Sequence, residues 1–182
     1  MAEISKNDRR VQRTKRNLRS SLVKLMKMKK INKISVKELT ELADVNRATF
    51  YAYYVDIFDM VEQLENEMIE EIKKVVTIGN DTNGGDCTFF IKVFDIIKEN
   101  EDLFSILLRN DGDCSFFEKF KKAIMDYKFS LEINIASKTD HFVIPFVVSG
   151  LFGTIQQWLI EGMKVPSTEM GQFVMKRVLN ER

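Results

Sequence analysis

Residues 35–56 carry the signals of two short helices joined by a tight turn. Ser35 with Glu38 three positions later forms the pattern of a capping box, which predicts that a helix starts at about Val36. Asn46 is suited to capping the helix that follows, and Asp44 tolerates the backbone of a turn. The predicted buried face of the first helix consists of apolar residues at helical spacing: Leu39, Leu42 and Ala43.

The second helix of this pair has side chains suited to the groove of a DNA duplex. Phe50 and Tyr54 are predicted to anchor the helix inward. A three-residue turn between two such helices is typical of a helix-turn-helix, in which the N-terminal part of the second helix meets base edges. The residues that this helix offers to a partner are Arg47, Thr49, Tyr51 and Tyr53.

Charge is distributed unevenly along the chain. Residues 1–56 contain 14 Lys and Arg against 6 Asp and Glu, a balance of +8, whereas the rest of the chain contains 14 against 21, a balance of −7. A basic head gains affinity for DNA by neutralising phosphates and releasing counterions. An acidic body is repelled by DNA, which helps to orient the head. For the first ten residues, a solvated basic tail is the alternative interpretation.

The composition favours an all-α chain, because its 182 residues include only 2 Pro and 8 Gly. An apolar content of 45% with 30% charged residues is ordinary for a globular protein. The N-terminus lacks the apolar segment of a signal peptide, so we expect a cytoplasmic protein. The longest apolar run, residues 142–155, is shorter than the roughly 20 residues that a membrane span requires, so no membrane contact is expected.

The sequence contains no recognisable catalytic or metal-binding set. Cys87 and Cys114 lie far apart, which favours buried thiols over a disulfide, although a redox-sensing pair is an alternative. His141 is the only histidine, which excludes a His-rich metal site. Gly84 and Gly85 stand in a polar linker and do not form a phosphate-binding loop. We therefore expect no metal, no cofactor and no enzymatic activity.

The hydrophobic pattern predicts about nine helices and two domains. Residues 1–56 form the predicted helix-turn-helix DNA-binding domain, and residues 57–182 form the predicted ligand-sensing and dimerisation domain. The clearest linker is the polar run 80–86. Outside the helix-turn-helix, the predicted helices cover about 8–28, a long helix capped by Asp56, 87–99, 101–109, 115–136, a helix from about 141 to 163, and 168–179.

The long helix after Asp56 belongs to both predicted domains, so it is suited to transmitting motion between them. Its outer face is acidic. Its predicted apolar stripe consists of Ile57, Val61, Leu64, Met68, Ile72 and Val75.

The helix that ends near Met163 is apolar on nearly every side between Phe142 and Leu159. A helix that is hydrophobic all round must be buried all round, so one face is expected to pack within the subunit and another against a second copy. The alternative is a central core helix in a monomer. The predicted dimer interface comprises Ser149, Gly150, Gly153 and Phe173.

The segment 43–54, Ala-Asp-Val-Asn-Arg-Ala-Thr-Phe-Tyr-Ala-Tyr-Tyr, resembles a motif of the TetR family of bacterial transcriptional regulators. That family commonly shows Ala-Gly-Val-Ser-x-x-Thr-Leu/Phe-Tyr-x-His-Phe at this place. The resemblance covers almost the whole chain. The C-terminal part is similar to a subgroup that includes regulators of dihydroxyacetone kinase operons, in the segments 104–108, 116–120, 149–153 and 157–163.

The resemblance implies an all-helical homodimer that binds palindromic double-stranded DNA through its first three helices and dimerises through its last two. Tyr53 stands where His is usual, Asp44 replaces the usual turn Gly, and the segment 55–57 lacks the Lys that many members have there. By matching position, Arg47 and Ala48 would face bases. Phosphates or base edges would be contacted by Thr49, Tyr51 and Tyr53, while Ser35 and Lys37 would hold the DNA backbone.

The leading functional hypothesis is a repressor released from DNA by an effector bound in the C-terminal domain. The alternative is a coactivator whose C-terminal domain binds a partner protein. The effector itself is unknown. The residues predicted to line its pocket are Phe94, Phe104, Phe117, Phe120, Tyr127 and Trp158, and plain core packing is the alternative interpretation for each of them.

Overall fold

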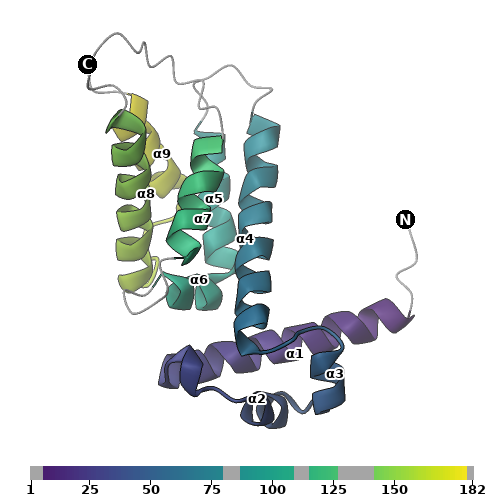
Figure 1. Cartoon of the computed structure of the whole chain (residues 1–182). Coiled ribbons are helices and arrows are strands. Elements are labelled where there is room, and N and C mark those ends of the chain that lie inside the picture. Colours follow the sequence, from purple (N-terminus) through teal and green to yellow (C-terminus); the bar gives the residue numbers. More distant parts are fainter. Residues whose placement is uncertain (1–5, 80–86, 109–114, 127–141, 180–182) are drawn as a thin grey trace. The chain divides into compact units, whose positions relative to one another are not determined.

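The computed structural model describes residues 6–79, 87–108, 115–126 and 142–179 of the chain. Every regular element within these ranges is helical, as the sequence predicts (Figure 1). The chain divides into two compact units, residues 1–64 (unit 1) and residues 65–182 (unit 2). The predicted functional domains, 1–56 and 57–182, stay a prediction.

Unit 1 holds the predicted helix-turn-helix. Its elements are α1 (Lys6–Met28), a short 3-10 helix (Ile31–Lys33), α2 (Val36–Ala43), α3 (Arg47–Tyr51) and the first residues of α4 (Ile57–Gly79). The first helix therefore begins two residues before the predicted Asp8, and the basic connector after it contains the 3-10 turn.

The core of unit 1 is built where α1 packs on α2 and α2 packs on α3. Leu18, Leu22, Leu39 and Phe50 have no exposed surface. Burying an apolar side chain of this size contributes about 1.5–3 kcal/mol each, so these residues account for much of the stability of the unit.

The prediction that Leu42 belongs to the buried face of α2 is wrong, because its side chain is 49% exposed. Thr40 lies on the buried side of α2 instead and is only 2% exposed. Its hydroxyl donates to the carbonyl oxygens of Val36, at 2.8 Å, and Lys37, at 3.0 Å. A threonine whose hydroxyl is bonded to its own helix is inexpensive to bury, and this allows the helix to turn Leu42 outward.

Unit 2 contains the rest of α4 together with α5 (Thr88–Glu99), α6 (Glu101–Leu107), α7 (Ser115–Asp126), α8 (Val143–Ile160) and α9 (Ser167–Leu179). The most extensive pairing is between α5 and α9, and α8 packs on both α6 and α7 (Figure 1). Of the predicted helix 115–136, the structure describes α7 up to Asp126, and residues 127–136 lie outside the described residues.

The stripe predicted for α4 is right at four positions and needs correction at two. Ile57, Leu64, Met68 and Ile72 are buried, but Val61 and Val75 are half-buried. Met60 and Ile69 are buried in their place because the buried face of the helix is broader than a single line of residues.

The end of α8 explains why this helix stops at Ile160, three residues before the predicted Met163. Gly162 and Met163 both have left-handed backbone, with φ of 75° and 51°. The N–H of Met163 donates to the carbonyl oxygen of Trp158 at 2.9 Å, which is the long bond of a Schellman motif. No helix in the described ranges is long and apolar enough to cross a membrane.

Candidate nucleic-acid interface

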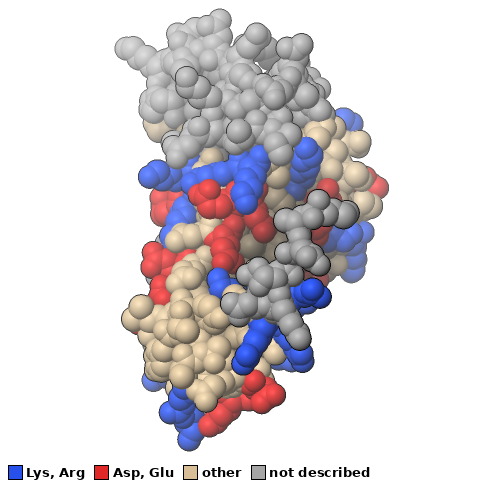
Figure 2. Space-filling model, turned by 90° about the vertical axis from the view of Figure 1, so that its right-hand side faces the viewer, with Lys and Arg blue, Asp and Glu red and all other residues tan. Residues whose placement is uncertain are grey.

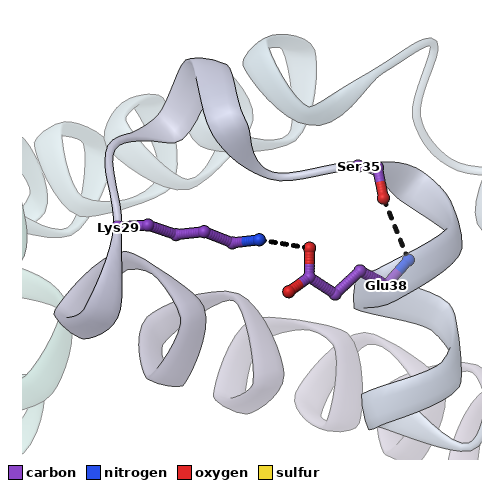
Figure 3. A network of polar contacts seen from close by, with 3 residues as sticks. All are labelled: Lys29, Ser35 and Glu38. Atoms are coloured by element: carbon purple, nitrogen blue, oxygen red, sulfur yellow. Dashed lines mark hydrogen bonds and ion pairs between the residues drawn. The ribbon is translucent and has the colours of Figure 1, made fainter.

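The N-terminus of α2 is capped as the sequence predicts, but only one half of the predicted capping box forms. The N–H of Glu38 donates to Oγ of Ser35 at 3.2 Å. The carboxylate of Glu38 pairs with Nζ of Lys29 instead of turning back to Ser35 (Figure 3). Lys29 directly follows α1, so this ion pair ties the end of α1 to the start of α2.

The turn between α2 and α3 takes the shape that its residues predict. Asp44 has left-handed backbone, with φ 53° and ψ 49°. The N–H of Val45 donates to the carbonyl oxygen of Thr40 at 3.0 Å, which closes a Schellman motif. Asp is among the few residues other than Gly that adopt this conformation readily, so its presence at a position where Gly is usual is compatible with the turn.

Helix α3 is fixed at its start and anchored from below. The N–H of Ala48 donates to Oδ1 of Asn46 at 2.8 Å, so Asn46 is the N-cap that the sequence predicts. Phe50 has no exposed surface and Tyr54 is 4% exposed, which confirms both as inward anchors. Their rings lie 5.4 Å apart between centroids.

These anchors leave one side of α3 free for a partner. Arg47 and Ala48 are exposed, and Tyr51 is 59% exposed. Thr49 is half-buried. Exposed arginine and hydroxyl-bearing side chains are groups that can donate hydrogen bonds to base edges and phosphates.

Tyr53 lies just beyond α3 and is held by contacts within unit 1. Its ring is half-buried, and Nζ of Lys15 on α1 lies 5.7 Å from the ring centroid. Its carbonyl oxygen accepts a hydrogen bond from Nε2 of Gln63 at 3.3 Å.

At the other end of the helix pair, Ser35 and Lys37 are both exposed at the start of α2.

The start of α4 shows a reciprocal cap that the sequence analysis missed in part. Oδ1 of Asp56 accepts from the N–H of Asp59 at 2.8 Å, which confirms Asp56 as the N-cap. Oδ2 of Asp59 accepts from the N–H of Val55 at 2.7 Å, and Gln63 donates to both carboxylate oxygens of Asp59 at 3.2 Å. The signal was the spacing Asp-x-x-Asp. The helix end where a Lys is usual therefore carries two carboxylates.

Four of the six residues predicted to line an effector pocket, Phe94, Phe104, Phe120 and Trp158, lie in the packed interior of unit 2. Phe94 and Trp158 meet edge to face at 5.1 Å between ring centroids, and Nε1 of Trp158 donates to the carbonyl oxygen of Val165 at 2.8 Å. Phe104 and Phe120 are each 1% exposed, whereas Phe117 is half-buried. These contacts are those of a core, and Tyr127 lies outside the described residues.

The residues predicted to form a dimer interface are all at the surface of the single chain. Ser149, Gly150 and Gly153 are exposed on α8, and Phe173 on α9 is 48% exposed. Apart from the chain neighbours and the backbone of its own helix, a Cβ atom added at either glycine would have no heavy atom of the chain within 4 Å. Phe146, one turn before Gly150, is 79% exposed. A wide apolar side of α8 is thus uncovered in one chain.

Several polar contacts of unit 2 gave no signal in the sequence. The carboxylate of Glu65 pairs with Nζ of Lys119, and Gln156 donates to the carbonyl oxygen of Leu108 at 2.7 Å. Cys87 is a free, half-buried thiol, while Cys114 and His141 lie outside the described residues. In the described ranges, no group of His, Cys, Asp and Glu is arranged to hold a metal ion.

Comparison with solved structures places the fold among transcriptional regulators. A TetR transcriptional regulator from Streptococcus agalactiae is 22% identical, with a TM-score of 0.67 over 97% of this chain and 98% of that one. The dihydroxyacetone kinase operon activator DhaS is 16% identical, with a TM-score of 0.62 over 91% and 94%. The regulator FadR from Bacillus subtilis, solved with stearoyl-CoA, is 15% identical, with a TM-score of 0.58 over 90% and 97%.

The match to a family model covers less of the chain than the structural matches do, but it assigns the family. None of the curated proteins matches the chain. The family model TetR_C_8, described as "Transcriptional regulator C-terminal region", matches residues 88–180, which is just over half of the chain. The chain therefore belongs to the TetR family of transcriptional regulators.

Proposed function

We propose that this protein is a cytoplasmic, sequence-specific DNA-binding regulator that acts as a homodimer on a palindromic operator. The observation that carries the proposal is the exposed row Arg47, Ala48 and Tyr51 on a helix that is capped by Asn46 and anchored by the buried Phe50. A short helix presented in this way fits the major groove of B-DNA.

The side chains divide into base-reading and phosphate-holding groups. Arg47 is the proposed base reader, because an exposed guanidinium can donate two hydrogen bonds to one guanine. Ala48, beside it, allows close approach or contacts a thymine methyl group. Thr49, Tyr51 and Tyr53 are proposed to contact phosphates or base edges, and Ser35 and Lys37 to hold the backbone.

Dimerisation is proposed through the uncovered side of α8 together with α9. Gly150 and Gly153 leave open space on this side, so a second helix can approach closely. Phe146 and Phe173 supply exposed apolar surface beside them. A twofold dimer suits a palindromic site, since two recognition helices about 34–36 Å apart enter successive major grooves on one face of the duplex.

Regulation is proposed to occur by release of DNA when an effector binds unit 2. One structural neighbour was solved in complex with stearoyl-CoA, so this thioester is the first effector to test. A second candidate is activation through a partner protein, favoured by the neighbour described as an operon activator and by the exposed apolar side of α8.

The test of DNA recognition is selection of duplexes from a random pool by the full-length protein. We expect enrichment of a palindrome, bound at least a hundredfold more tightly than random duplex of the same length. A pool that stays random after repeated rounds, with equal affinity for all sequences, would contradict sequence-specific recognition. Arg47→Ala is the matched variant and should fail to enrich the same site.

The test of regulation measures binding of the selected duplex with and without a candidate effector. A repressor of the proposed kind loses affinity when the effector is added, and by linkage it binds the effector less tightly when DNA is present. If cell extract supplies a protein that joins the complex on DNA without displacing it, the activator alternative is the better description.

A further inference from the structure

Tyr53 differs from the other aromatic and polar residues proposed to contact DNA in how its side chain is held. Those of α3 stand between Arg47 and Tyr51, so the helix backbone sets the directions of their side chains. Tyr53 lies two residues beyond the end of α3, in the turn before α4. Because no helix backbone orients it there, the position of its ring depends on contacts with other elements of unit 1.

The backbone of Tyr53 is fixed from both neighbouring helices. Its N–H donates to the carbonyl oxygen of Phe50 on α3 at 2.9 Å, and its carbonyl oxygen accepts from Nε2 of Gln63 on α4 at 3.3 Å. Gln63 is itself held in place, because the same nitrogen donates to both carboxylate oxygens of Asp59 at 3.2 Å. The freedom that remains at Tyr53 is therefore rotation of its side chain.

Two contacts restrict that rotation. The ring of Tyr54, which is 4% exposed, lies 6.4 Å from the ring of Tyr53 between centroids, at 63° between the ring planes. Nζ of Lys15 on α1 lies 5.7 Å from the centroid of the Tyr53 ring. An ammonium within about 6 Å of a ring centroid is attracted to the negative face of the ring, and the attraction is stronger where the groups are shielded from water. Lys15 and Tyr53 are both half-buried.

We propose that Lys15 is a positioning residue for DNA binding, which holds the ring of Tyr53 so that its hydroxyl reaches a phosphate or a base edge. This inference rests on the proposed DNA contact of Tyr53 and deepens it, because it names the residue that sets the ring. Lys15 acts through the ring and needs no DNA contact of its own. A ring that is held before binding loses less rotational freedom when DNA arrives, so affinity is higher.

A double-mutant cycle with the full-length protein on the selected duplex tests the inference. Tyr53→Phe removes the hydroxyl but keeps the ring, and should weaken binding about fivefold, as for one lost hydrogen bond. Lys15→Met removes the ammonium and should weaken binding about two- to fivefold. The double variant should bind as Tyr53→Phe does, because the hydroxyl that Lys15 positions is already gone. Lys15→Arg should bind like the unmodified protein, since a guanidinium is also attracted to the ring.

The loss of one positive charge needs a matched control, because Lys and Arg side chains reach the surface at many places (Figure 2). Lys24→Met removes the same charge from an exposed position of α1, about 13 Å farther along the helix at 1.5 Å per residue. Any effect of Lys24→Met on affinity should be the same with Tyr or Phe at position 53. Lys15→Met should lower the slope of log affinity against log salt by much less than the roughly 0.9 per head of a lost phosphate contact.

The ring of Tyr53 can be followed directly in protein labelled with 3-fluorotyrosine. The chain contains four tyrosines, and the Tyr53→Phe variant assigns the fluorine resonance of Tyr53. Without DNA, Lys15→Met should shift that resonance and leave the resonance of Tyr51, on the exposed side of α3, in place. If the Tyr53 resonance is the same with Lys and Met at position 15, Lys15 does not set the ring and the inference is wrong.

The inference and the proposed function fail on different results. If the unmodified protein binds no duplex even at low salt, the proposed function is wrong and the inference falls with it. If the protein selects its palindrome but Tyr53→Phe binds it equally well, the inference alone is wrong. The same holds if the losses from Lys15→Met and Tyr53→Phe multiply and the salt slope falls by about 0.9 per head, because Lys15 then contacts a phosphate itself. If Lys15→Met and Lys15→Arg both lose helix content, Lys15 serves folding and the inference is again wrong.

Discussion

Nζ of Lys119 on α7 lies 2.9 Å from Oε2 of Glu65 on α4, and this ion pair is largely shielded from water. The side chain of Glu65 is 7% exposed and that of Lys119 is 26% exposed. A buried charge that loses its partner keeps its desolvation cost, so the pair fixes how α4 and α7 pack within unit 2.

Breaking this pair is expected to destabilise the protein. Lys119→Met should lower the free energy of unfolding by about 2 kcal/mol, less than for a fully buried pair because Lys119 is partly exposed. Adding Glu65→Gln should recover part of the loss, as a double-mutant cycle in urea would measure. Lys73→Met, which removes a pair with Glu70 whose side chains are 44% and 60% exposed, is the control and should cost under about 0.5 kcal/mol. Additive losses in the cycle would contradict the coupling.

Gly171 is required for the packing of α9 on α5. A Cβ atom at this position would lie 2.5 Å from Cγ1 and 2.7 Å from the backbone nitrogen of Ile91. Because backbone cannot move aside like a flexible side chain, Gly171→Ala should destabilise the protein by about 1–3 kcal/mol. Gln172→Ala, at the exposed neighbouring position, should change stability by no more than about 0.5 kcal/mol. Equal thermal midpoints for the two variants would show that α9 can shift away from α5.

Gly153→Arg is expected to separate the proposed dimer without unfolding the subunit. A Cβ atom at Gly153 meets nothing within the chain, so the substitution fits a single subunit, while the charge would be forced into the dimer contact. Sedimentation should show a monomer at micromolar concentration with unchanged helix content. Asn66→Arg on the exposed side of α4 should leave the dimer intact. If the unmodified chain sediments as a monomer at the same concentration, the proposed dimer is wrong.

Arg47 and Lys37 are expected to differ in what they contribute to DNA binding. Arg47→Ala should cost about 1–3 kcal/mol on the selected site and relax preference at one base pair per half-site. Lys37→Ala should weaken binding to all sequences alike and flatten the salt dependence. Fluorescence anisotropy on selected and random duplexes distinguishes the two effects. If Arg47→Ala loses the same affinity on both duplexes, Arg47 does not read a base.

Buried residues along α4 are expected to affect the response to effector. Leu64, Met68 and Ile72 are each at most 3% exposed, and the helix continues without a break across the boundary between the two units. A volume-conserving change such as Met68→Leu should alter release by effector more than DNA affinity without effector, and leave the dimer intact. If the variant loses stability and DNA binding together, while its folded fraction still releases DNA normally, these residues only pack the core and do not transmit the response.

Local signals predicted most of unit 1, because each depends on residues a few positions apart. Ser35, Asn46 and Asp56 cap their helices as expected, since a side-chain oxygen near a free N–H needs no distant partner. Asp44 takes its left-handed turn for the same reason. The inward positions of Phe50 and Tyr54 follow from helical spacing.

The residues whose contacts the sequence did not predict are those whose environment is set by distant parts of the chain. Glu38 turns to Lys29 because α1 and α2 pack together, and that contact is not visible in the spacing of Ser35 and Glu38. Phe117 is half-buried because it packs against Phe152, whose ring centroid lies 4.5 Å away on α8.

The sequence by itself thus determined where helices begin, where they turn and which end of the chain is basic, because capping, backbone preference and charge are local properties. Only the tertiary structure decided that Leu42 faces water, that Glu65 is buried beside Lys119 and that Gly171 touches Ile91. The physical reason is that burial and close approach depend on which helix faces which, and packing between residues far apart in sequence sets this.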